Sequence, residues 1–267
     1  MSRRLQPLDW ALGAVAAAGF AVLYAPVLTV CLFSFFEPIR RRGHLSLGPF
    51  SLDTYGALAH NGEILGALTL TLAVGAAATL LAVGLGLMFA LYYVSTSGLG
   101  RQVMQAIIFL PFLLPPIITG LALLIFFREI DLARGLLTIV VGHVVFIVPV
   151  VYRTLLVRLQ SLSHSLTEAS YDLGASAFQT LRLVLLPQLR PALVTSALLA
   201  FAVSFDETLI TLFLASSEPT LPLRLWSMMR LGFVPEINAL ATLILVFAGL
   251  VTSVISRLQA RAGSSQV

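Results

Sequence analysis

The chain has 267 residues, of which 58% are hydrophobic and only 10% are charged. A water-soluble domain of this size carries roughly 25% charged residues, so the composition excludes that class and predicts an integral membrane protein. All 16 basic residues are arginine. Because a P-loop needs a lysine that reaches the β- and γ-phosphates, no such ATP site is expected, and any ATP would be bound by another chain.

Six apolar runs are long enough to cross the hydrocarbon core, which takes a helix of about 20 residues. They cover roughly residues 9–35, 64–94, 103–127, 135–157, 190–214 and 237–257. We therefore expect an all-α, polytopic membrane protein that forms one transmembrane domain with six helices. The first run is longer than the apolar region of a signal peptide, about 7–15 residues, and is expected to be a retained span.

Two of these runs carry local signals. Small residues recur at every fourth position of the second run, at Ala82, Gly86 and Ala90, which favours a close helix–helix contact. Three prolines predict a kink or an interruption in the third run, at Pro111, Pro115 and Pro116. Such an interruption either lines a transport pathway or serves packing alone. The single cysteine, Cys31, excludes an internal disulfide and lies in an apolar run.

A polar segment of about 30 residues, near 160–187, separates the fourth and fifth runs. Ser165 and Glu168 have the spacing of a capping box, which predicts a short helix from about Leu166 to Leu173. Gly174 follows, and glycine is the residue best suited to the left-handed conformation just past a helix end.

A second helix is expected directly after this glycine. Ser176 and Gln179 form a second capping box, and Pro187 marks the end of that helix or a kink. Both helices are amphipathic, and we expect the apolar side chains to face inward at Leu166, Ala169, Leu173, Phe178, Leu181 and Leu185. Such an elbow either docks a partner protein or lies flat on the membrane surface.

The polar segment also resembles the EAA loop of ABC-importer permeases, whose pattern is E-A-A, three residues, a glycine, nine residues, an isoleucine, one residue and then L-P. Here the motif reads EASYDLGASAFQTLRLVLLP, residues 168–187. Its fixed positions are occupied by Glu168, Ala169, Ser170, Gly174, Val184, Leu186 and Pro187. Ser170 stands where the motif has its last alanine, and Val184 where it has isoleucine.

This resemblance implies a cytoplasmic loop that docks on an ATPase subunit, with Glu168 facing that subunit and Gly174 turning the coupling helix. It also implies that both chain termini are cytoplasmic. With that orientation, nine arginines lie inside and seven outside, a weak positive-inside bias. The chain itself would bind no cofactor, and ATP and Mg²⁺ would be bound by the partner ATPase subunits.

Two adjacent acids, Asp206 and Glu207, interrupt the fifth apolar run. An ionised acid near the centre of a membrane helix costs on the order of 2.5–3.5 kcal/mol, so such residues commonly face a cavity or a charged partner. One acid could face the solute path while the other pairs with Arg224 or Arg230. Alternatively, both belong to a structural ion pair near the outer surface.

The C-terminal third resembles the permeases of spermidine/putrescine-type ABC importers. The similar parts are the Asp-Glu pair, the run from Thr220 to Leu223, Trp226 with the two residues after it, and Pro235 to Ala239. The resemblance implies a bacterial inner-membrane complex with a second permease, two ATP-binding subunits and an external solute-binding protein. Trp226 could bind a polyamine by a cation–π contact. Other solutes of this group include aminoethylphosphonate, amino acid derivatives and ferric iron.

Two other classes remain possible at this point. An ion-driven secondary transporter would use Asp206 and Glu207 as proton sites, although no repeat of interrupted helices is evident. A membrane scaffold would need no ATPase partner. His143 is expected to be a hydrogen-bonded packing residue, and no enzyme, metal or nucleic-acid signature accompanies the four histidines and one cysteine.

Overall fold

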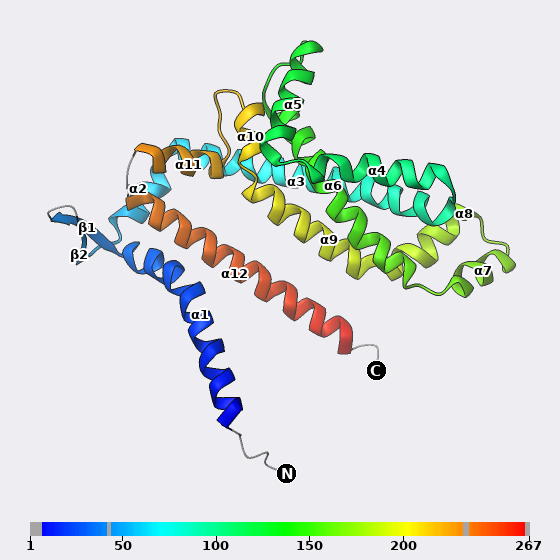
Figure 1. The fold of residues 1–267 in the computed structure, drawn as a ribbon, viewed down its shortest axis with the longest axis horizontal. Helices are drawn as coiled ribbons and strands as arrows, with labels where there is room; N and C mark the ends of the chain where they lie inside the picture. The colour runs from blue at the N-terminus through cyan, green and yellow to red at the C-terminus, as the bar shows by residue number, and fades with distance from the viewer. Residues whose placement is uncertain (1–6, 42–43, 232–234, 265–267) are drawn as a thin grey trace. The chain divides into compact units, whose positions relative to one another are not determined.

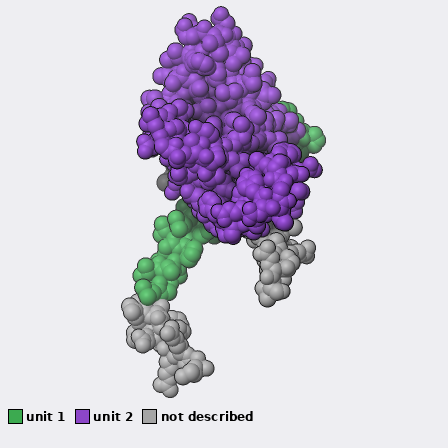
Figure 2. Space-filling model, turned by 90° about the vertical axis from the view of Figure 1, so that its right-hand side faces the viewer, with its two compact units in different colours: residues 1–62, 227–267 green, residues 63–226 purple. Residues whose placement is uncertain are grey.

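The computed structural model describes residues 7–41, 44–231 and 235–264, which form helices and one β-hairpin (Figure 1). The chain divides into two compact units, coloured separately in Figure 2. The first unit comprises residues 1–62 and 227–267, and the second comprises residues 63–226. Each unit has packing of its own.

The first unit combines three helices with the hairpin: α1 (Pro7–Phe33), β1 (Phe36–Arg41), β2 (His44–Phe50), α2 (Asp53–His60) and α12 (Pro235–Ser264). Helices α1 and α2 both pack against α12. The Tyr55 hydroxyl donates to Ser34 Oγ at 2.7 Å, and the Tyr55 ring lies 5.5 Å from that of Phe35, so α2 is joined to the base of the hairpin. From Leu12 to Phe33, most apolar side chains of α1 are exposed, as expected where lipid or another chain covers a helix.

The second unit contains the helices α3 (Gly62–Ser95), α4 (Leu99–Leu113), α5 (Pro116–Glu129), α6 (Leu136–Gln160), α7 (His164–Asp172), α8 (Ala177–Gln179), η1 (Thr180–Leu185), α9 (Leu186–Asp206) and α10 (Leu209–Leu214). Helix α11 (Leu221–Leu231) belongs to this unit as far as Trp226 and to the first unit from Ser227 on. Helix α6 is apolar around most of its surface and lies at the centre, with α4, α5, α9 and α10 packed against it. Its fully buried Tyr152 places its ring 6.0 Å from Phe109 and 6.3 Å from Tyr93.

The predicted close contact of the second span is confirmed, and it lies within this chain. A Cβ atom on Gly86 would come within 2.7 Å of Val151 Cγ1 on α6, so only glycine allows this approach. Ala82 and Ala90 on the same stripe are completely buried. The stripe of small residues therefore packs α3 against α6.

The count of six spans is not confirmed. Among the described residues, four helices are long and apolar enough to cross a membrane: Leu12–Phe33, Gly62–Ser95, Leu136–Gln160 and Ala177–Asp206. A bent pair, α4 with α5, would be a fifth. The sixth predicted span lies in α12, a helix of 30 residues, Pro235–Ser264, in which Glu236–Leu250 is an apolar stretch.

The third predicted span is not one helix, because α4 and α5 meet at an angle of 107°. Leu114 is extended at φ −79° and ψ 143°, and Pro115 follows with ψ 137° before Pro116 begins α5. A residue before proline is pushed out of the helical conformation, which explains why the chain breaks here. The predicted interruption at these prolines is confirmed.

The boundaries predicted for the fifth span, 190–214, are wrong at both ends. The helix starts at Ala177, passes through the π-helical turn η1, and ends at Asp206. Pro187 therefore does not end the second helix of the polar segment. It lies in the first turn of α9, directly after the wider turn of η1, where its missing N–H and its ring are accommodated.

Candidate functional site

The polar segment folds as the predicted elbow. Helix α7 ends at Asp172, and Gly174 adopts φ 80°, the left-handed conformation. The Gly174 N–H donates to the Tyr171 carbonyl at 2.8 Å and the Ala175 N–H to the Ser170 carbonyl at 3.1 Å. These two bonds make a Schellman motif, which satisfies the last carbonyl groups of α7 and turns the chain.

One of the two predicted capping boxes is present. The Ser176 hydroxyl accepts the Gln179 N–H at 3.3 Å, and Gln179 Oε1 accepts the Ser176 N–H at 2.7 Å. The box predicted at Ser165 is wrong, because α7 starts two residues earlier. Its N-cap is Ser163, whose hydroxyl accepts the Ser165 N–H at 3.3 Å.

A buried hydrogen bond closes the elbow. Ser170 and Thr180, both less than a tenth exposed, place their hydroxyl oxygens 2.9 Å apart and so join α7 to η1. Ser170 stands where the EAA motif has alanine, and its hydroxyl makes a hydrogen bond to Thr180 that an alanine could not make. The sequence marked Ser170 only as a departure and did not indicate Thr180, because no spacing rule links positions on two separate helices.

The outer face of the elbow is apolar and exposed. The predicted inward orientation is wrong for Leu166, Leu173 and Phe178, which are 39%, 88% and 68% exposed. Helix α7 packs mainly against η1, and Leu173 and Phe178 are left largely uncovered by the described part of the chain. Glu168 and Ala169 are also exposed, Val184 and Leu186 are half-buried, and Pro187 is exposed. Exposed apolar side chains gathered on one element are typical of an interaction surface.

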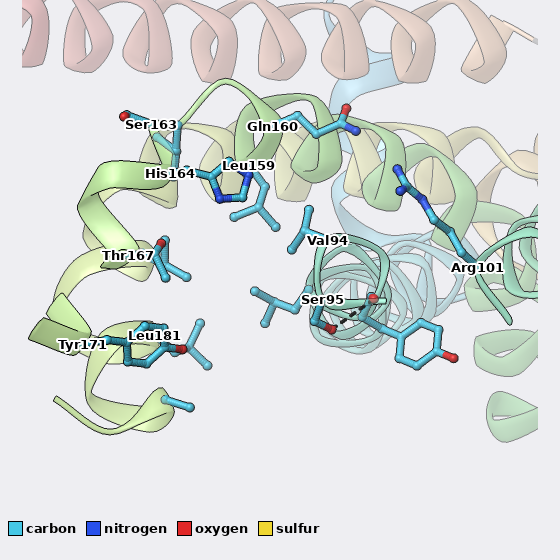
Figure 3. Close-up of a pocket in the computed structure, with 15 residues that line it drawn as sticks. Val94, Ser95, Arg101, Leu159, Gln160, Ser163, His164, Thr167, Tyr171 and Leu181 are labelled. Carbon is cyan, nitrogen blue, oxygen red and sulfur yellow. Dashed lines mark hydrogen bonds between the residues drawn. The ribbon is translucent and has the colours of Figure 1, made fainter. Parts of the chain in front are cut away.

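A cavity of about 770 Å³ lies on the inner side of α7, between the elbow and the ends of α3, α4 and α6 (Figure 3). His164 and Thr167 line it from α7, while Arg101 lines it from α4 with its guanidinium carbon 3.3 Å from the centre of the Tyr93 ring. The cavity separates α7 from these helix ends, and α7 is joined to the rest of the unit by its contact with η1.

The two acids lie at a break in the helix, which the sequence did not predict. Asp206 is the last residue of α9 and is exposed, while Glu207 is half-buried. Glu207 Oε1 accepts the Ile210 N–H at 2.7 Å and so stabilises the start of α10. Both acids line a cavity of about 370 Å³ with Phe146, Ala202 and Val203, and Trp226 is not among its lining residues.

The suggested ion pair between one of these acids and Arg224 is not formed in the described part of the chain. Arg224 instead pairs with Glu63 at the start of α3. The other suggested partner, Arg230, belongs to the first unit. Glu63 and Arg224 are far apart in the sequence, so the sequence alone did not indicate this pair.

His143 connects the two sides of the helix break. Its Nδ1 lies 2.7 Å from Ser204 Oγ on α9, and its Nε2 lies 2.8 Å from Thr211 Oγ1 on α10. All three side chains are buried. The expectation of a hydrogen-bonded packing histidine is confirmed, while its position across the break was not predictable from the sequence.

Residues 64–263 match the family described as the binding-protein-dependent transport system inner membrane component. The chain belongs to this family. The resemblance found in the sequence is thereby confirmed, and the chain is a membrane component of an ABC importer.

Two relatives match this chain over most of its length. The chain is 35% identical over 257 residues to the putrescine transport system permease protein PotI of Escherichia coli K12, covering 93% of this chain and 90% of the relative. It is 32% identical over 230 residues to the spermidine/putrescine transport system permease protein PotC of Haemophilus influenzae, covering 86% and 88%.

Solved structures of ABC transporters share the fold. A bacterial ABC transporter that imports the acidic polysaccharide alginate aligns with a TM-score of 0.70 at 20% identity, covering 96% of this chain and 99% of that chain. The MetNI methionine transporter in inward-facing conformations aligns with a TM-score of 0.62 at 20% identity, covering 80% and 99%. At this level of identity, these structures show the fold alone.

Proposed function

We propose that the chain is the permease subunit of an ATP-driven importer of polyamines, spermidine or putrescine, and forms part of the solute path by alternating access. The observation that carries the proposal is the closed elbow followed by one continuous helix, Ala177–Asp206, that ends at two acids. The names of the similar PotI and PotC permeases support the solute class.

The chemistry of the helix break suits a polycation. Asp206 is exposed at an open cavity, and its carboxylate can bind a protonated amine as water is displaced. Phe146 lines the same cavity and offers an aromatic face to a cation. Trp226, half-buried on α11, is a further candidate contact for the solute elsewhere on the path.

The elbow is the proposed docking site for an ATPase subunit. Its exposed residues Glu168, Leu173 and Phe178 would contact that subunit, and Gly174 would set the angle between α7 and α8. In this arrangement the elbow is cytoplasmic, and so are both chain termini. ATP and Mg²⁺ would be bound by the ATPase subunits, which makes this chain the non-enzymatic partner.

The complete importer would contain a second, related permease, two ATP-binding subunits and an external solute-binding protein in the bacterial inner membrane. One solved relative is an alginate transporter in complex with a solute-bound periplasmic protein, and it aligns with a TM-score of 0.72. The second permease would cover the apolar surface of α1 together with lipid.

The test is ATP hydrolysis by the purified complex, co-expressed with its genomic neighbours and reconstituted in vesicles. We expect hydrolysis to rise when binding protein loaded with putrescine or spermidine is added outside. A rise only with aminoethylphosphonate, an amino acid derivative or ferric iron would keep the importer and change the solute. Uptake driven by a proton gradient without any ATPase would contradict the proposal.

A further inference from the structure

His143 lies in the middle of a hydrogen-bond chain that joins Ser204 to Thr211 and ends at the Glu207 carbonyl oxygen. The Thr211 hydroxyl donates its only proton to the Glu207 carbonyl oxygen at 3.1 Å. With its proton placed there, the Thr211 hydroxyl accepts from His143, and in the matching tautomer Nε2 carries a proton and donates across 2.8 Å. In the neutral imidazole Nδ1 is then an acceptor, and the Ser204 hydroxyl donates to it across 2.7 Å.

This chain of bonds joins residues on both sides of the helix break. Ser204 belongs to the last turn of α9, and Thr211 belongs to α10. Between them the backbone leaves the helical path at Glu207, with φ −70° and ψ 113°. His143, which belongs to a third helix, α6, therefore makes hydrogen bonds to the residues on both sides of the break.

Helix α10 is fixed against α5 and α6 by close backbone approaches. A Cβ atom on Gly142 would lie 2.5 Å from Leu214 Cδ1, and one on Gly120 would lie 3.1 Å from the Ile210 Cα atom. The Leu214 carbonyl also accepts the Gly135 N–H at 3.2 Å, with the Thr138 hydroxyl 3.0 Å away. Helix α10 is thereby held in place, so the bond from His143 to Ser204 attaches the end of α9 to a fixed support.

We infer that His143 is a positioning residue: it holds the end of α9 on α10 and thereby sets the direction in which Asp206 and Glu207 enter their cavity. The inference about the solute rests on the proposed function, in which these acids contact the polyamine. The inference about geometry does not, because the hydrogen bonds join α6, α9 and α10 whatever the solute is.

The variants remove the two hydrogen bonds of His143 either together or one at a time. His143→Phe fills a similar volume without donors or acceptors, while His143→Gln keeps an amide that can donate to Thr211. Ser204→Ala and Thr211→Val remove the partner hydroxyls. Thr154→Val is the matched control, because its hydroxyl lies on the same helix α6 but bonds only to Val150 of that helix at 2.9 Å.

The first readout is geometric and independent of the solute. Spin labels are placed on the exposed positions 199 of α9 and 212 of α10, outside the cavity of the two acids, through Leu199→Cys and Leu212→Cys in an otherwise cysteine-free complex with Cys31→Ser. We expect the distance distribution to broaden or shift in His143→Phe and to stay narrow in His143→Gln and Thr154→Val. An unchanged distribution in His143→Phe would overturn the inference.

The second readout is transport of radiolabelled putrescine by the same complexes. We expect the KM for loaded binding protein to rise about tenfold in His143→Phe with the maximal rate changed much less, because the two buried hydrogen bonds that position the acids are lost. Adding Ser204→Ala to His143→Phe should give little further change. A changed distance with an unchanged KM would support the positioning role and contradict the assignment of Asp206 and Glu207 to the solute path.

Discussion

Asp206 and Glu207 are neighbours in the sequence with different surroundings. Asp206 is exposed at the end of α9, whereas Glu207 is half-buried and accepts the Ile210 N–H at 2.7 Å. A substitution can therefore remove the charge of Glu207 while it keeps an oxygen for the backbone. The two acids are separable by experiment.

We predict that Asp206→Asn lowers polyamine uptake about tenfold at low solute concentration, because a carboxylate that binds an amine loses its charge.

Glu207→Gln retains an acceptor for the Ile210 N–H, whereas Glu207→Ala loses that acceptor and destabilises the protein by about 1 kcal/mol. Uptake in vesicles and thermal unfolding of the purified complex measure these effects. If Asp206→Asn and Glu207→Gln, singly and together, leave uptake unchanged in an assembled complex, the acids do not act on the solute.

Gly174 provides a second prediction at this scale. Its φ of 80° suits glycine, and a Cβ atom at this position would meet nothing within 4 Å, so substitution costs conformational energy alone. Gly174→Ala is expected to cost about 1–2 kcal/mol, while Gly174→Pro is incompatible with this φ and opens the elbow. We expect Gly174→Pro to insert in the membrane normally and to lose stimulation of ATP hydrolysis. Normal transport by that variant would contradict the role of the elbow.

At the scale of elements, α10 is a short helix whose position depends on glycine. Gly142 on α6 and Gly120 on α5 let the two helices approach α10 closely. Six residues bury too little surface to fold as a helix alone, so tertiary contacts must stabilise α10. The break before α10 is therefore maintained from outside the broken segment.

We predict that Gly142→Leu displaces α10 and destabilises the protein by about 1–3 kcal/mol, because Ile210 and Leu214 are fully buried and leave no room for a side chain. Gly84→Leu on α3 is the matched control, since Gly84 is exposed and a Cβ atom there would meet nothing within 4 Å. Thermal unfolding in detergent measures both. Equal unfolding temperatures for the two variants would contradict the close packing of α10.

Local sequence patterns predicted the elements whose causes are local. Prolines break the chain between α4 and α5, and Gly174 with Ser176 and Gln179 turns the elbow, because each effect acts within four residues. The break at Glu207 was missed, since it depends on His143 and Gly142 of another helix. The inward orientation of Leu173 and Phe178 was wrong, because amphipathic spacing does not say whether a face is covered by the chain itself or by a partner.

At the scale of the whole molecule, one helical segment of 30 residues, Ala177–Asp206, connects the elbow to the acids. Its length is about 45 Å at 1.5 Å per residue, enough to cross the hydrocarbon core. A rigid element of this kind can carry a displacement between its ends. The sequence located both ends but did not show that they share a helix, because Pro187 was compatible with either a helix end or a kink.

We predict that softening this helix uncouples hydrolysis from uptake. Val194 and Thr195 are exposed at its middle, and Val194→Gly with Thr195→Gly makes the helix about 1 kcal/mol less favourable at each position than alanine would. The expected result is more ATP hydrolysed per polyamine imported, with assembly retained. The control is Val194→Ala with Thr195→Ala, which favours the helix and should leave the ratio unchanged. An unchanged ratio in the glycine variant would show that coupling takes another route.

The closed elbow has a consequence for the thermodynamics of assembly. Its Schellman bonds, its caps and the buried Ser170–Thr180 bond fix the backbone before any partner arrives. A preorganised surface loses little conformational entropy on binding, so the association free energy comes mainly from the desolvation of Leu173 and Phe178. Burial of such apolar area lowers the heat capacity, and titration calorimetry of docking at several temperatures should therefore give a negative ΔCp without the large entropic penalty of a segment that folds as it binds.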